Sequence, residues 1–234
     1  MTVPNARQRA RSELERVIKD TAGRHVAAGG AAALSLRAVA RELGLASSAL
    51  YRYYPSRDAL LTALIVQAYD AVGAVAEHAA DATGGSHGVR WQAVCRAVRS
   101  WAHQHPHDWA LVYGTPVPGY AAPQDTVASA TRIAGVMAAI VLAAAADGSL
   151  RPPARPLPGP RLVTAAVLDL AGGPPAAPYE DVLERSIVLL AALVGTVSYE
   201  LFGHTHTAFT DDAAWFDIAM AVAAEGVGLE LPLG

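Results

Sequence analysis

Apolar residues recur every three to four positions along most of the chain, which is the spacing of one face of an α-helix. Residues 7–28, for example, carry Leu14, Val17, Ile18 and Val26 at this spacing. No segment shows the strict alternation that is typical of a β-strand. The sequence therefore predicts an all-α fold. The expected helices cover residues 7–28, 35–43, 47–53, 56–81, 89–104, 108–113, 124–147, 161–171, 179–202 and 212–229.

Serine, glycine and proline mark the ends of several of these helices. Ser35 and Ser56 are expected to cap the N-termini of the second and fourth helices, because a serine hydroxyl accepts a bond from a free backbone N–H. Gly44 is expected just beyond the second helix and Pro55 just beyond the third. Pro160 suits the first turn of the helix at 161–171. Loops are expected at 114–123, 151–160 and 172–178, where proline and glycine gather.

The second and third helices are short and are joined by a tight turn that contains Gly44, which is the pattern of a helix-turn-helix motif. No linker separates the third helix from the long fourth one. We therefore expect two domains: a three-helix DNA-binding head at residues 1–56 and a helical body at residues 57–234. The fourth helix would join the body to the head rigidly.

The charge distribution supports a polyanion as the partner of the head. Residues 1–60 hold ten Arg or Lys and five Asp or Glu, whereas the rest of the chain holds eight and sixteen. A basic head on an acidic body indicates contact with nucleic acid, although chance clustering stays open. Cys95 is the single cysteine, so no intramolecular disulfide can form. The longest apolar stretches, 134–146 and 187–197, are shorter than the roughly 20 residues of a membrane span. We expect a cytoplasmic protein with no membrane partner.

A recognition helix in the major groove needs small, polar or cationic residues on its outer side. In the third helix, Leu50 and Tyr54 suit the buried side. Arg52 suits either a guanine edge or a phosphate, and Tyr53 suits either packing or DNA contact. The residues expected to contact DNA are Ser35, Arg37, Ser47, Ser48, Tyr51, Arg52, Tyr53 and Arg57.

The stretch LSLRAVARELGLASSALYRYYPSRDALLTALI, residues 34–65, resembles the DNA-binding domain of TetR-family transcriptional regulators. The match includes Ala40, Gly44, the Leu50-Tyr51 pair and Tyr54, together with Ser56, Arg57 and Leu60. Ala46 departs from the family pattern, because Ser or Thr usually supplies a capping hydroxyl there. Ser48 replaces a frequent glycine. The resemblance implies a regulator, most often a repressor, that leaves operator DNA when an effector binds the body.

Residues 101–123, WAHQHPHDWALVYGTPVPGYAAP, resemble the WHG-type C-terminal domain of some TetR regulators. The match rests on Trp101, His105-Pro106, Leu111, Gly114 and Pro118-Gly119-Tyr120. Large rings gather here in a chain poor in aromatic residues, so they can line an apolar pocket or plug the junction between head and body. His105 can be a pocket donor, a switch or a core histidine. The effector would be a small apolar or aromatic molecule. Its expected lining is Trp101, His105, Trp109, Tyr113, Tyr120, Met137 and Phe202.

The last two helices carry wide apolar stripes that one body cannot easily cover. We therefore expect a homodimer built from residues 179–202 and 212–229, unless these stripes complete the core of a monomer. The first stripe is Leu183, Ile187, Leu190, Val194, Val197 and Leu201, and the second is Trp215, Ile218, Ala219, Val222 and Gly226. Gly195 and Ser198 would allow close helix approach.

No catalytic or cofactor motif stands out. His103, His105 and His107 alternate, but residues two apart on a helix point in different directions, so a metal site is not expected. Cys95 lies on an apolar helical face and suits the core. Two other function classes stay open: an architectural DNA-binding protein without an effector, and a helical metal-dependent enzyme. A specific ligand that changes DNA affinity would favour the regulator, whereas turnover abolished by chelation would favour the enzyme.

Overall fold

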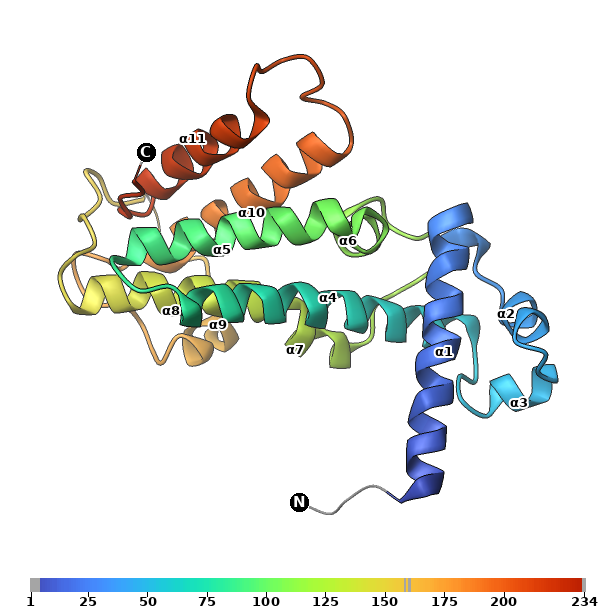
Figure 1. Ribbon diagram of the computed structural model, residues 1–234. Helices are drawn as coiled ribbons and strands as arrows, with labels where there is room; N and C mark the ends of the chain where they lie inside the picture. Colours follow the sequence, from blue (N-terminus) through green and yellow to red (C-terminus); the bar gives the residue numbers. More distant parts are fainter. Residues whose placement is uncertain (1–4, 158, 160, 233–234) are drawn as a thin grey trace. The chain divides into compact units, whose positions relative to one another are not determined.

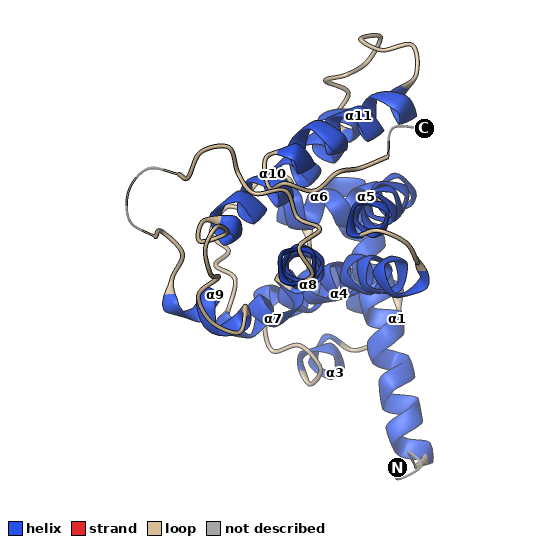
Figure 2. Cartoon of the chain, turned by 90° about the vertical axis from the view of Figure 1, so that its left-hand side faces the viewer, coloured by secondary structure: helices blue, strands red, loops and turns tan. Residues whose placement is uncertain are grey.

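The computed structural model describes residues 5–157, 159 and 161–232, and these residues form only helices, turns and loops (Figures 1 and 2). The all-α prediction is confirmed. The elements are α1 (Ala6–Gly29), η1 (Ala31–Ala33), α2 (Leu36–Glu42), α3 (Ser47–Tyr51), α4 (Arg57–Ala82), α5 (His87–Gln104), α6 (Pro106–Tyr113), η2 (Gln124–Thr126), α7 (Val127–Ala130), α8 (Arg132–Ala146), α9 (Ala165–Leu170), α10 (Val182–Leu201) and α11 (Asp212–Glu225).

The chain folds into two compact units whose boundaries are not those of the predicted domains. The first unit contains Met1–Tyr69 and His107–Ala128, and the second contains Asp70–Pro106 and Ser129–Gly234. The first half of α4, together with α6 and the loop after it, thus belongs to the same unit as the helix-turn-helix. The division at residues 56 and 57 stays a prediction about functional domains.

The core of the first unit forms where α1, α2, α3 and the start of α4 bring their apolar faces together. Ile18, Val39, Leu50 and Leu60 are fully buried there. Partly buried residues of α6 and its loop, including Leu111 and Tyr120, pack against this cluster.

The predicted serine caps of α2 and α4 and the glycine after α2 are confirmed. The Ser35 hydroxyl accepts a bond from the backbone N–H of Ala38 at 3.4 Å, and the Ser56 hydroxyl accepts one from Ala59 at 3.0 Å. Gly44 follows α2 with φ of +65°, a conformation that glycine adopts without strain.

In the second unit, α5, α8, α10 and α11 pack against one another. α5 buries the apolar face that its sequence predicts, whereas the faces that α10 and α11 bury differ from their predicted stripes. Their core includes Trp91, Val94, Cys95 and Val98 of α5, Met137 and Ile140 of α8, Leu189 and Leu193 of α10, and Phe216 and Met220 of α11. Burial raises the pKa of the Cys95 thiol well above its usual range, as expected for a core residue.

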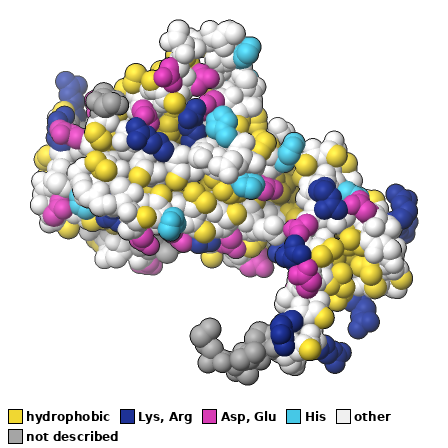
Figure 3. All heavy atoms as spheres, viewed as in Figure 1, with side chains coloured by type: hydrophobic (Ala, Val, Ile, Leu, Met, Phe, Trp, Pro, Cys, Tyr) yellow, Lys and Arg dark blue, Asp and Glu magenta, His cyan; other side chains and the backbone are white. Residues whose placement is uncertain are grey.

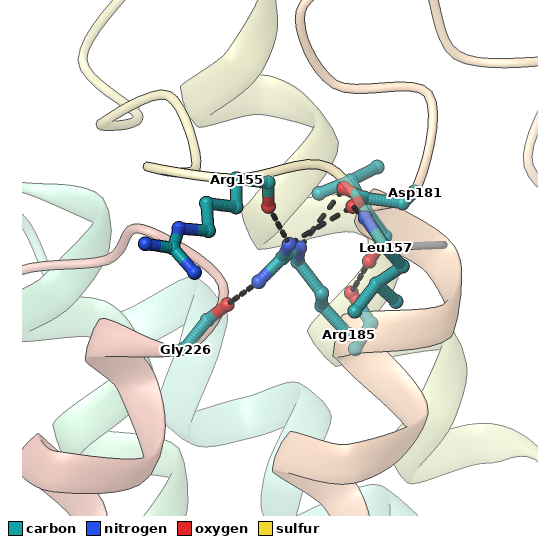
Figure 4. Close-up of polar contacts among 7 residues, drawn as sticks. Arg155, Leu157, Asp181, Arg185 and Gly226 are labelled. Atoms are coloured by element: carbon teal, nitrogen blue, oxygen red, sulfur yellow. Dashed lines mark hydrogen bonds and ion pairs between the residues drawn. The ribbon is translucent and has the colours of Figure 1, made fainter.

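Arg185 of α10 holds the proline-rich segment and the end of α11 in place (Figure 4). Its guanidinium pairs with Asp181 and donates to the backbone carbonyls of Arg155, at 2.7 Å, and of Gly226, at 3.0 Å. Asp181 in turn accepts a bond from the backbone N–H of Leu157 at 2.7 Å. A segment without regular structure is thereby fixed by charge-assisted bonds.

The C-terminal residues cross the first turn of α5 at close range. The side chain of Gln92, which is 5% exposed, donates to the backbone carbonyl of Pro232 at 2.9 Å. A Cβ atom at Gly88 would lie 1.8 Å from the backbone carbonyl oxygen of Glu230. Gly88 therefore makes room for the chain that passes over it.

The single helix expected at 124–147 is wrong, because the structure breaks this segment into η2, α7 and α8. The two parts, Gln124–Ala130 and Arg132–Ala146, are bent by 47°. At the break, Arg132 pairs with Glu77 through two bonds and with Asp70 at 3.1 Å. Gly73 lies beside Arg132, where a Cβ atom would come within 2.8 Å of the arginine Cβ. This long-range contact stabilises the break and cannot be seen in helical periodicity.

Other helices end a few residues from their predicted limits. α3 ends at Tyr51, α10 begins at Val182 and α11 ends at Glu225. The helix expected at 161–171 is shorter and covers Ala165–Leu170, and Pro160 lies outside the described residues.

Two helices are long and apolar enough to cross a membrane, judged by length and composition alone, and the bent pair around Thr131 would make a third if it formed one span. They are α4 and α10. In the most apolar window of α4, 44% of the residues are buried inside the protein, against 33% for α10. The sequence predicted both helices, but a count of uninterrupted apolar stretches did not single them out by this measure. The large exposed share of α10 leaves apolar side chains on the surface.

Candidate nucleic-acid interface and the helical body

Helix α3 separates its two sides as a groove-reading helix requires. Leu50 is fully buried, whereas Tyr51 is 44% exposed. Ser47, Ser48 and Arg52 are exposed as well. Ala46 precedes the helix without a side-chain cap, which leaves the first backbone N–H groups of α3 unpaired by this residue. The outer surface of α3 therefore offers hydroxyls, a phenol and a guanidinium.

The N-terminal end of α2 presents two further predicted residues. Ser35 and Arg37 are both exposed. The hydroxyl of Ser35 already serves the helix as its cap, and a serine oxygen has a second lone pair and a hydrogen for another partner.

Arg57, at the start of α4, forms hydrogen bonds within the first unit. Its guanidinium donates to the backbone carbonyl of Ala31 at 2.8 Å and pairs with Asp58 at 3.0 Å. Only 31% of the side chain is exposed. Arg57 thus links α4 to the turn before α2, and its contact with phosphate stays a prediction.

Two polar contacts of the head were missed by the sequence reading, because they join residues far apart in the chain. Glu42 of α2 accepts bonds from Arg24 at 2.7 Å and from His25 at 2.6 Å, both on α1. The His25 bond, followed by the Arg24 bond, lowers the pKa of the Glu42 carboxyl. The guanidinium of Arg11 lies over the ring of Tyr53, 5.7 Å from its centre. Both contacts hold α1 against the helix-turn-helix.

Basic side chains stand on the surface of this unit. In Figure 3, dark-blue Lys and Arg side chains gather where Figure 1 labels α1, α2 and α3. This surface accords with the excess of basic residues in the first 60 positions.

The aromatic residues predicted to line one pocket fall in both units. Trp101 and His105 belong to the second unit, with ring centres 5.1 Å apart. Trp109 belongs to the first unit and is fully buried, and its ring centre lies 4.5 Å from that of Tyr113. Tyr120 shares a hydrogen bond of 2.9 Å with Thr62 of α4. Burial raises the pKa of Tyr113. Within the first unit these rings therefore also serve the core.

The remaining predicted lining residues differ in burial. Met137 is buried in the second unit, whereas Phe202 is 47% exposed. His105 is exposed, so its interpretation as a core histidine is wrong: it lies at the C-terminal end of α5, with its ring beside that of Trp101. Within the described residues, no three His, Cys, Asp or Glu side chains gather as metal ligands would.

The stripes on the last two helices are partly core and partly surface. Leu183 and Val197 are buried in the second unit, because α10 turns this side toward α5 and α8. Ile187 is 54% exposed and Val222 is 64% exposed. The large apolar side chains exposed on α10 and α11 are Ile187, Val188, Tyr199, Ile218 and Val222.

Family models match both parts of the chain. Residues 18–64 match "Bacterial regulatory proteins, tetR family", and residues 91–223 match "Tetracyclin repressor-like, C-terminal domain". The second match covers more than half of the chain and includes the stretch at 101–123 that carries the WHG-type resemblance.

The chain is also similar to known proteins along nearly its whole length. It is 39% identical to the HTH-type transcriptional regulator Rv1816 of Mycobacterium tuberculosis over 229 residues, which cover 94% of this chain and 96% of the relative. The crystal structure of the regulatory protein SCO4313 has a TM-score of 0.71 and 29% identity, with 94% of this chain and 98% of that one covered.

A TetR-family regulator from Shewanella sp. PV-4 shares the fold, with a TM-score of 0.63 at 17% identity and coverage of 92% and 98%. TetR-family regulators bind DNA and dimerise. Family models and full-length relatives agree with the exposed helix-turn-helix, and the chain belongs to the TetR family of bacterial transcriptional regulators.

Proposed function

We propose that the protein is a homodimeric repressor that binds a palindromic operator and releases it when a small effector binds the body. The observation that carries DNA reading is the division of α3 into a buried side at Leu50 and an exposed side at Ser47, Ser48, Tyr51 and Arg52. A helix of this kind places small and cationic side chains at base edges in the major groove.

Within this proposal, phosphate contacts position the head and base contacts specify the operator. Ser35, Arg37 and Arg57 flank α3 and suit phosphates, because the N-terminal ends of α2 and α4 also attract anions. Tyr51 and Tyr53 can donate their hydroxyls to phosphate. Arg52 is exposed and can offer its planar fork to guanine.

The test begins with selection of operator DNA from a random duplex pool, followed by fluorescence anisotropy with the selected duplex. Arg52→Ala should lose about 1–3 kcal/mol of discrimination at one position if Arg52 reads guanine. Uniform weakening across sequences would assign it to phosphate instead. Arg155→Ala removes the same charge from an exposed side chain of the body and serves as the control. Unchanged affinity in Arg52→Ala would refute its role.

The proposed dimer uses the apolar side chains that α10 and α11 leave exposed. Two copies related by a twofold axis would cover Ile187, Tyr199, Ile218 and Val222 in a four-helix bundle. A Cβ atom at Gly195 would have no heavy atom within 4 Å, which leaves room for an approaching helix. Half-sites should then lie about one helical turn, roughly 34 Å, apart or at a close multiple. Sedimentation showing a monomer at micromolar concentration would refute the dimer.

The proposed effector is a small apolar or aromatic molecule held by the body. The buried side chains of Trp101 and Met137 support such a site in the second unit, because apolar walls suit an apolar ligand. α4 runs without a break through Tyr69 and Asp70, where the two units divide, so it can carry a shift from one to the other. Only a ligand with different affinities for the two states can drive this change. Coupling of about 1–3 kcal/mol would change operator affinity roughly 5–150-fold.

The effector proposal is tested with a panel of small aromatic acids, amines and neutral hydrocarbons added to the operator complex. A compound that lowers operator affinity should lose its effect in Trp101→Phe, while DNA binding without compound stays near wild type. If Trp101→Phe instead lowers melting temperature and operator affinity together, the ring of Trp101 is a structural plug. If no compound acts, the architectural DNA-binding protein becomes the better description.

We also propose a cytoplasmic location and no membrane partner. In this proposal the apolar side chains of α4, including Leu60 and Leu64, serve the core of the head, and the exposed side of α10 serves the dimer. Recovery of the protein from the membrane pellet of lysed cells, resistant to high salt, would refute it.

A further inference from the structure

A hollow of about 480 Å³ lies between the N-terminal half of α1 and the end of α3. We propose that it seats one backbone phosphate of duplex DNA, which would add α1 to the operator interface. This inference rests on the proposed DNA-binding function and assigns two arginines that lie outside the helix-turn-helix. The hollow is lined by Arg7, Ala10, Arg11, Leu14, Ala49, Arg52 and Tyr53.

The composition of the hollow suits an anion. Three arginines, Arg7, Arg11 and Arg52, line it, and all three are exposed. A guanidinium presents its N–H groups in a planar fork that matches two oxygens of a phosphate. Ala10, Leu14, Ala49 and Tyr53 form the remaining wall and carry no charged side chain.

Arg11 is held in position before any ligand arrives. Its Nε donates to the Glu15 carboxylate at 3.0 Å, and its guanidinium lies over the Tyr53 ring, 5.7 Å from the centre. Among the described residues, no hydrogen bond is formed by its two terminal nitrogens. These two nitrogens can therefore donate to the oxygens of a ligand. Arg11 therefore presents one edge of its fork to the hollow.

The position of the hollow favours a duplex backbone over a free metabolite. Arg52 and Tyr53 directly follow Tyr51, whose exposed ring lies on the side of α3 proposed to enter the major groove. A groove is bordered by its own phosphates, so a duplex that meets α3 brings an ordered row of anions to the same end of the helix. The hollow has a volume of about 480 Å³, and arginines outnumber the other polar residues that line it.

A phosphate seat has a signature that differs from base reading. Loss of one phosphate contact lowers the slope of log Kobs against log salt by about 0.9 and weakens binding to all sequences alike. The advantage of the wild type over a variant that lacks the contact should therefore shrink about 3.5-fold between 50 and 200 mM salt.

The experiment measures binding of a random-sequence 24-base-pair duplex and of a selected operator, each at several salt concentrations. The variants are Arg7→Ala and Arg11→Ala. Arg16→Ala is the matched control, since it removes the same charge from the same helix but outside the hollow; Arg16 pairs with Glu13 and Asp20 on the surface. Urea unfolding of each variant checks that the head is intact.

We expect Arg11→Ala to weaken both duplexes equally and to lower the salt slope by about one relative to Arg16→Ala. Arg11→Lys should restore part of the affinity, because it keeps the charge but loses the fork. If the slopes of Arg7→Ala and Arg11→Ala equal that of Arg16→Ala, the hollow seats no phosphate and the regulator proposal stands. If the wild type binds neither duplex, the proposed function fails and the inference fails with it.

Discussion

Replacement of Gly88 by alanine should displace the C-terminal residues from their packing against α5. The added Cβ atom would lie 1.8 Å from the carbonyl oxygen of Glu230 and 2.7 Å from its carbon, which are backbone atoms. The tail cannot avoid this clash by rotating a side chain, so residues near Glu230 must move away from α5.

The expected cost follows from what the tail contributes. The bond from Gln92 to Pro232 would be lost, and Gln92, 5% exposed, would be left partly unsatisfied, at a cost of about 1–3 kcal/mol. Leu229 is 3% exposed and would lose part of its burial. Alanine gains at most about 1 kcal/mol in helix propensity. We therefore expect a net loss of about 2 kcal/mol in unfolding free energy, or a fall in Tm of roughly 4–8 °C.

Thermal and urea unfolding at one fixed protein concentration would measure this loss, because dimerisation would make Tm depend on concentration. The matched control is Gly135→Ala in α8, where a Cβ atom would have no heavy atom within 4 Å. The same substitution should stabilise the protein there by about 0.5–1 kcal/mol. Equal stability of Gly88→Ala and wild type would refute the claim that the tail is locked over this glycine.

Three further predictions concern the dimer, the acid limit and the head. Val222→Glu should place a charge on the proposed interface and yield monomers in sedimentation at micromolar concentration, whereas dimers would locate the interface elsewhere. The bond from Ser149, and to a smaller extent the bond from His87, lowers the pKa of the Asp147 carboxyl from 3.8 to about 2. The ionised Asp147 therefore stabilises the fold above about pH 4, and this contribution is lost as the pH falls toward 2. Asp147→Asn should flatten that part of a pH–Tm profile, and an unchanged profile would contradict it. Arg57→Ala should weaken random and selected duplexes alike and also lower the stability of the head by about 1 kcal/mol; loss of discrimination at a single base pair would show base reading instead.

The helix-turn-helix could be predicted from the sequence because local signals determine it. Ser35, Gly44 and Ser56 mark helix ends through bonds and dihedral angles within a few residues. Helical periodicity alone assigns Leu50 to the buried side of α3 and Tyr51 to its exposed side, without information from the rest of the chain.

The features that were missed depend on residues far apart in the sequence. The break before α8 is stabilised by Arg132 with Glu77, 55 positions away, so periodicity over 124–147 cannot reveal it. The predicted stripe of α10 contains both buried and exposed residues for the same reason. Helices that are distant in the chain cover Leu183 but leave Ile187 exposed. The sequence grouped the aromatic rings by proximity along the chain; the structure assigns them to two units, and their role as one ligand site stays a prediction.

Because α4 is long, a small tilt of this helix displaces its far end by several ångströms. Its 26 residues span about 39 Å at a rise of 1.5 Å per residue, and the helix is continuous across the division of the two units. Each degree of tilt about one end displaces the other end by about 0.7 Å, as follows from this length. A tilt of about 5° thus moves the far end by roughly 3.4 Å, the height of one base-pair step. Under the proposed effector mechanism, a ligand that tilts α4 by this amount would shift the recognition helices relative to the operator without a large rearrangement.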